Sequence, residues 1–104
     1  MRGIVWGYTF RDGVNKLKEI EENYNRIGIK SDNKRKTKNN YSIIFSNGDN
    51  WQVARYSESS RGLKANISYV DIRIDLEFVN TIIKYSTYLP PYNAIRYFEA
   101  LQDC

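Results

Sequence analysis

Histidine is absent from this 104-residue chain, and Cys104 is its one cysteine. This composition excludes nucleophiles of the Ser-His-Asp and Cys-His types, histidine acid–base catalysis, disulfide frameworks and zinc sites built on cysteine and histidine. The side chains that remain available for catalysis are carboxylates, tyrosines and lysines. Magnesium-assisted reactions of phosphate groups also remain possible. The sequence is therefore compatible with only a short list of enzymes.

Two stretches place such residues in an ordered pattern. One is Ile44-Phe45-Ser46-Asn47-Gly48-Asp49, an apolar strand that runs into an Asn-Gly turn. The other is Arg61-Gly62-Leu63-Lys64-Ala65-Asn66-Ile67-Ser68-Tyr69-Val70-Asp71, an Arg-Gly pair followed by an apolar strand that ends on an aspartate.

Together these stretches resemble the large-terminase and helicase type of P-loop ATPase. In those families an x-F-x-N-G-S strand-turn precedes an R-G-x-x-x-(N/D)-x-x-x-x-D-E segment. The resemblance runs roughly over residues 1–75, and its specific motifs lie in residues 41–71. It implies that Asp71 falls on the magnesium-binding aspartate, and that Ile72 stands where those enzymes carry the glutamate that polarises water.

The phosphate-binding half of such an ATPase is missing from the sequence. Its chemistry needs glycines for close backbone approach, a lysine on the phosphates and a hydroxyl on magnesium. Residues 6–13 stand in the corresponding place, and no Gly-Lys-Ser/Thr occurs in the chain. Asp12 would repel phosphate at the start of the following helix. We therefore predict no catalytic residues, no metal and no cofactor, and expect Asp71 to pair with Arg73 or a lysine.

The net charge of +4 is concentrated in one segment, residues 30–40. This segment has no apolar residue and is predicted to be a solvated loop or the frayed start of a strand. It is either a flexible solvated loop or a surface that contacts a phosphate backbone or an acidic protein. The candidate partner-binding residues are Lys30, Lys34, Arg35, Lys36 and Lys38, with Arg61, which could instead make a loop or capping contact.

Tyrosines form a second candidate surface around Pro90-Pro91. They either cover a sheet edge or form an amphipathic interface of the kind enriched in aromatic residues. Single-strand stacking also uses aromatics between basic residues, but Arg96 is the one cation near them. The four residues are Tyr85, Tyr88, Tyr92 and Tyr97.

The elements that position these residues follow from periodicity. We expect a strand at residues 4–10 and a helix that Asp12 caps and Gly28 ends. The apolar positions of this helix are Val14, Leu17, Ile20, Tyr24 and Ile27. A hairpin over residues 41–57 is predicted with the three-residue loop Asn47–Asp49, so that Phe45 faces Trp51 and Ile43 faces Val53. Tyr24, Tyr41 and Tyr69 are expected to face the core.

The remaining elements are a strand at residues 66–74, a helix from Asp75 to about Thr87, and a weaker helix or turn from Ile95 to Leu101. The predicted fold is a single α/β (α+β) domain over residues 1–104, with a mixed or antiparallel sheet of about four strands and two to three helices.

The functional expectation is a binding protein and not an enzyme. No run approaches the roughly 18 apolar residues of a membrane span, and no secretory signal opens the chain, so the protein is expected in the cytosol. The resemblance implies a phage or mobile element. We expect an accessory protein that binds and blocks or redirects a host macromolecule, such as an anti-CRISPR inhibitor. A nucleic-acid-binding module and a degenerate nucleotide-binding domain are the alternatives.

Overall fold

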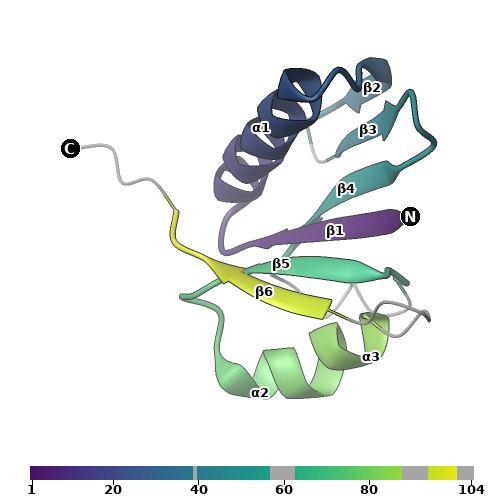
Figure 1. Cartoon of the computed structure of the whole chain (residues 1–104). Helices are drawn as coiled ribbons and strands as arrows, with labels where there is room; N and C mark the ends of the chain where they lie inside the picture. Colours follow the sequence, from purple (N-terminus) through teal and green to yellow (C-terminus); the bar gives the residue numbers. More distant parts are fainter. Residues whose placement is uncertain (39, 57–62, 88–93, 101–104) are drawn as a thin grey trace.

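The computed structural model describes residues 1–38, 40–56, 63–87 and 94–100. Over these residues the chain forms one mixed sheet in the strand order β2-β3-β4-β1-β5-β6 (Figure 1). β1 pairs in parallel with β4 and β5, β5 pairs in parallel with β6, and the β2–β3 and β3–β4 pairs are antiparallel. The strands are β1 (Arg2–Gly7), β2 (Ser31–Lys36), β3 (Tyr41–Phe45), β4 (Asn50–Arg55), β5 (Ile67–Asp71) and β6 (Ala94–Phe98).

The α/β class is confirmed, whereas the prediction of about four strands is wrong, because the described sheet has six. Both unpredicted strands lie at sheet edges. β2 replaces the loop expected in residues 30–40, and β6 replaces the helix or turn expected after Ile95. An edge strand has a neighbouring strand on one side only, and its other backbone edge is exposed. It can therefore form without alternating apolar residues, and charged side chains on it hinder pairing with strands of other molecules.

The helix α1 (Phe10–Arg26) covers one face of the sheet over β1, β4 and β3 (Figure 1). It buries Val14, Leu17 and Ile20 against Val5, Trp51, Val53 and the apolar side of β3. The prediction that Gly28 ends this helix is confirmed. Gly28 has a φ of 87°, and the amide of Ile29 donates a hydrogen bond to the carbonyl of Tyr24, as in a Schellman motif. Ile27 was expected in the core but is exposed at this end.

A second helix covers the opposite face beneath β5 and β6 (Figure 1). It comprises α2 (Leu76–Phe78), the π-helical segment η2 (Val79–Ile83) and α3 (Lys84–Ser86). Asp75 is its N-cap, as predicted, and accepts a hydrogen bond from the amide of Phe78. The apolar side packs on Ile4, Trp6 and Val70. No described helix combines the length and the apolar character needed to cross a bilayer.

The β3–β4 hairpin confirms the predicted face but not the predicted register. Ile43 pairs with Trp51, and the amide of Phe45 donates to the carbonyl of Asp49, which leaves Ser46–Gly48 as the loop. Gly48 takes a φ of 92° at its third position. The register differs from the expected one by two residues, an even step that keeps the apolar residues on the same face.

The three tyrosines that were expected to face the core pack against the α1-side cluster, and Tyr41 is fully within it. Tyr24 stacks on Phe45 with ring centroids 4.0 Å apart, and its hydroxyl donates to Asp49 at 2.6 Å. Burial first, and then this hydrogen bond, raises the pKa of Tyr24 to about 12. The contact therefore ties α1 to the hairpin loop with a neutral donor at physiological pH.

The junction between β1 and α1 depends on two glycines in close contact. A Cβ at Gly7 would lie 2.5 Å from the amide nitrogen of Gly13 and 2.4 Å from the carbonyl oxygen of Thr9. Both neighbours are backbone atoms, which cannot swing away as a side chain can. The sharp turn from β1 into α1 therefore requires glycine at position 7.

We predict that Gly7→Ala lowers the free energy of unfolding by about 1–3 kcal/mol, because a methyl group must displace backbone. Urea denaturation followed by circular dichroism measures this change. Asn23→Ala on the exposed side of α1 is the control and should stay within about 0.5 kcal/mol of the unaltered protein. Equal stability of the two variants would contradict the close approach of β1 and α1.

Candidate functional site

A cluster of polar and aromatic side chains lies at the carboxyl ends of β1, β4 and β5. We call it the strand-end cluster, and it consists of Tyr8, Asp12, Tyr56, Asp71 and Arg73. α1 follows β1 on one face of the sheet, whereas the second helix follows the neighbouring β5 on the other face. Such a point, where consecutive connections leave opposite faces, is where open α/β sheets form a crevice that binds ligands.

Asp71 is the buried centre of this cluster, with 0% of the residue exposed. One carboxylate oxygen accepts hydrogen bonds from the backbone amide of Arg73 at 2.9 Å and from Nε of Arg73 at 3.0 Å. The other oxygen accepts from Nη2 of Arg73 at 2.6 Å. The amide of Tyr8 donates a further hydrogen bond. The expected pairing of Asp71 with Arg73 is therefore confirmed.

Arg73 also joins Asp71 to the first turn of α1. Its Nη2 lies 2.5 Å from the carboxylate of Asp12 and 2.6 Å from that of Asp71. On its other side the guanidinium carbon lies 4.9 Å from the ring centroid of Tyr8, within the range of a cation–π contact. One cation thus occupies the space between two carboxylates that come from different elements.

The pKa shifts in the cluster have the same origin. Burial by itself would raise the pKa of Asp71, but hydrogen bonds from the side chain and then the backbone of Arg73 outweigh it and hold this pKa below its ordinary value. Hydrogen bonds to Asp71 first and Asp12 second raise the pKa of Arg73 above its ordinary value. The ion pair is therefore fully charged at neutral pH.

The sequence predicted that Asp12 caps α1, and this prediction is wrong. The N-cap is Thr9, whose side-chain oxygen accepts a hydrogen bond from the amide of Asp12 at 3.2 Å and contacts its carboxylate at 2.8 Å. Thr-x-x-Asp at residues 9–12 is a capping-box pattern that could have identified this cap. No local pattern, however, indicates that Asp12 meets Arg73, 61 residues later.

The connection from β1 to α1 consists of Tyr8 and Thr9 alone. A loop of the P-loop type needs several residues there, so that successive amides can surround a phosphate. Here the amide of Tyr8 points at Asp71, and the hydroxyl of Thr9 caps the helix. Among the described residues, no three histidine, cysteine, aspartate or glutamate side chains gather in one place.

The structure separates the basic residues that are consecutive in sequence. Lys34 and Lys36 point to the α1 side of the sheet, where Nζ of Lys34 lies 3.2 Å from Glu21 and Nζ of Lys36 lies 6.0 Å from the ring centroid of Tyr41. Arg35 pairs with Ser42 and therefore points to the opposite side. Lys30 and Lys38 are exposed beyond the ends of β2.

Two of the four candidate tyrosines lie together. Tyr85 and Tyr97 are 68% and 54% exposed and line one hollow of about 570 Å³ between the second helix and β6. Its other walls are formed by the apolar Val79 and Ile95, the polar Asn80 and Thr87, and the charged Lys84. Tyr88, Tyr92 and the candidate Arg61 lie outside the described residues.

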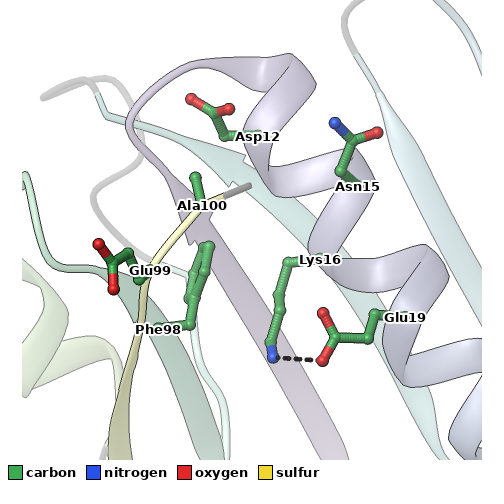
Figure 2. Close-up of a pocket in the computed structure, with 7 residues that line it drawn as sticks. All are labelled: Asp12, Asn15, Lys16, Glu19, Phe98, Glu99 and Ala100. Carbon is green, nitrogen blue, oxygen red and sulfur yellow. Dashed lines mark hydrogen bonds and ion pairs between the residues drawn. The ribbon is translucent and has the colours of Figure 1, made fainter. Parts of the chain in front are cut away.

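A smaller hollow lies between α1 and the end of β6 (Figure 2). Lys16 extends into it from α1, and its Nζ lies 3.2 Å from Glu19 and 5.5 Å from the ring centroid of Phe98. Its volume of about 20 Å³ would hold one water molecule. The charge of Lys16 is therefore satisfied within the protein, and this hollow is too small for a substrate.

Comparison of the chain with protein-family models, with curated proteins and with solved structures found no match.

The acid dependence of stability tests the Asp71–Arg73 pair. Because the pKa of Asp71 is lower in the folded than in the unfolded chain, ionised Asp71 stabilises the fold above about pH 4, and this contribution is lost as the pH falls through the lowered value. We predict that Asp71→Asn lowers the melting temperature at pH 7 by roughly 5 °C or more. The difference should shrink as the pH approaches 3.

Glu22→Gln, an exposed change on α1, serves as the control in these melting experiments. It removes an exposed carboxylate and should produce a much smaller difference at pH 7. If the difference between Asp71→Asn and the unaltered protein stays constant from pH 7 to pH 3, the charge of Asp71 does not stabilise the fold.

Proposed function

We propose that this protein is a non-enzymatic accessory protein of a phage or mobile element, which binds a host macromolecule in the host cytosol and inhibits or redirects it. The partner in this proposal is a host protein or a protein–nucleic-acid complex. Anti-CRISPR and other anti-defence inhibitors are the class to test first.

The observation that carries this proposal is the guanidinium of Arg73 between Asp71 and Asp12. In the ATPases that the motifs resemble, the aspartate at the position of Asp71 holds magnesium. Here a resident cation already satisfies both carboxylates, and four hydrogen bonds surround Asp71. A magnesium ion would have to displace Arg73 and leave its charge uncompensated. The arrangement supports a structural role for the motif aspartate.

The exposed charge supports a binding function. The basic residues of segment 30–40 lie on an edge strand and its two ends, and all five side chains are exposed. An unpaired strand edge offers backbone donors and acceptors to a partner, and the cations around it favour an anionic one. A nucleic-acid-binding module, the second candidate function, is favoured by the same positive edge.

The remaining alternative, a degenerate nucleotide-binding domain, makes a prediction that separates it from ours. A ligand present at one hundred times its Kd stabilises the folded state by about 2.7 kcal/mol, which in a domain of this size raises the melting temperature by roughly 10 °C or more. We expect millimolar magnesium-ATP to leave the melting temperature unchanged and to remain unhydrolysed. A rise of several degrees, or release of phosphate above that of a blank, would support the nucleotide-binding alternative.

Inhibition of host defence can be measured directly by phage plating. We predict that expression of this protein restores plaque formation on a host whose CRISPR system targets the infecting phage. Replacing Lys30, Lys34, Arg35, Lys36 and Lys38 by glutamine should weaken this protection, since it removes the positive edge. Arg96→Gln, on β6 at the opposite edge of the sheet from β2, is the control. Absence of protection against every defence system tested would contradict the anti-defence role.

A further inference from the structure

The sheet face opposite α1 is exposed at the β2 end. The second helix covers Ile4, Trp6 and Ala54 beneath β1, β4 and β5. From there to β2 no described element covers the sheet, and Ile44 in the middle strand is 40% exposed. We call this region the open sheet face, and its residues are Asn33, Arg35, Ser42, Ile44, Asn50 and Gln52.

The strand register arranges this face in two rows. The first row crosses the sheet from β1 to β2. In it Arg2 pairs with Asn50, Asn50 with Ile44, and Ile44 with Asn33. In the second row Gln52 faces Ser42, and Ser42 faces Arg35. A cation therefore stands at opposite corners of the face, Arg2 on β1 and Arg35 on β2. Three amides and a hydroxyl lie between them.

A third cation borders the same face. Lys64 and Arg2, together with Asn50, Gln52 and Leu63, line a hollow of about 300 Å³ at the start of β1 and β4. No described carboxylate forms an ion pair with Arg2, Arg35 or Lys64. The paired residues of the face include no acidic side chain, and Asp32 is the unpaired residue at the bulge of β2 beside Asn33. With three cations and one bordering carboxylate, the face has a net positive charge that attracts anions.

We infer that the open sheet face, with Arg2 and Lys64 at its border, binds the phosphate backbone of a double-stranded nucleic acid. This deepens the second candidate function, a nucleic-acid-binding module, by naming the chemistry of its partner, and it rests on that function. β1 and β2 are three strand spacings apart, about 14 Å. One small anion cannot reach both corners, whereas the phosphates on either side of a groove about 12 Å wide can.

The chemistry of the face favours nucleic acid over an acidic protein. Arginine, lysine, asparagine, glutamine and serine are the side chains that contact phosphate and sugar oxygens. A protein interface has an apolar centre with aromatic anchors, and Ile44 is the one apolar side chain between the cations. Single-strand platforms stack bases on aromatic rings, which the described part of this face does not contain. The binding mode that remains is contact between these side chains and the phosphate backbone of a duplex.

The test is an electrophoretic shift of a labelled 20-base-pair DNA duplex at salt concentrations from 50 to 200 mM. Three phosphate contacts give a slope of about −2.7 in a plot of log K against log salt, and so about a forty-fold loss of affinity over this range. Arg2→Gln, Arg35→Gln and Lys64→Gln combined should abolish the shift. Arg35→Gln alone should reduce the magnitude of the slope by about 1.

Two controls make the test specific to this face. Lys18→Gln, Arg26→Gln and Arg96→Gln combined removes the same charge on the α1 side of the molecule and should leave the shift in place. Lys34→Gln with Lys36→Gln, on the α1 side of β2, should weaken binding less than Arg35→Gln alone. Thermal melting of each variant confirms that it is folded.

Three outcomes would overturn the inference: no shift of the duplex at 50 mM salt, equal loss in both triple variants, or competition by polyglutamate as strong as that by the duplex. A single strand that binds more tightly than the duplex would also overturn it. If the duplex fails to bind while the protein still protects phage from host defence, the inference is wrong and the proposed function stands. If the duplex binds without protection, the anti-defence role is contradicted and the nucleic-acid-binding module is supported.

Discussion

A buried carboxylate constrains the whole carboxyl end of this sheet. Asp71 has no access to water, and an unpaired buried charge is strongly destabilising. Arg73 removes this cost, and it can do so only when the turn after β5 brings its guanidinium back over the strand end. Because the same guanidinium bridges to Asp12, the start of α1 is fixed relative to β5. The ionic contact therefore joins the start of α1 to the turn that leads from β5 into the second helix.

The arrangement of the helices explains both the stable core and the exposed surface. α1 packs over β1, β4 and β3, whereas the second helix packs beneath β1 and β5, so the central strand β1 is covered on both sides. The sheet is wider than either helix. Within the described residues, one face near β2 consequently remains uncovered, and its side chains are polar or cationic apart from Ile44. The fold creates a candidate binding surface without a dedicated loop.

The strand-end cluster and the open sheet face differ in whether their cations have counter-ions in the fold. At the strand ends the cation is internal and satisfied, so this region stabilises the fold. On the open sheet face no described carboxylate neutralises Arg2, Arg35 or Lys64, so their charge is available to a partner. The fold therefore supplies counter-ions for Arg73, whereas the described ion pairs include none for the cations of the open sheet face.

Local patterns in the sequence were sufficient for the body and end of α1, the buried face of the β3–β4 hairpin, β5 and the Asp75 cap, because periodicity, capping residues and turn glycines act over a few neighbouring residues. They gave the wrong N-cap for α1 and the wrong register for the hairpin. They also predicted the Asp71–Arg73 pair, whose members are two residues apart. β2 and β6 could not be predicted, since edge strands are defined by the neighbour that pairs with them and not by their own apolar pattern. The tertiary structure likewise decided that Asp12 meets Arg73. It also decided that Lys34 and Arg35 face opposite sides, because strand pairing turns adjacent residues to opposite faces of a sheet.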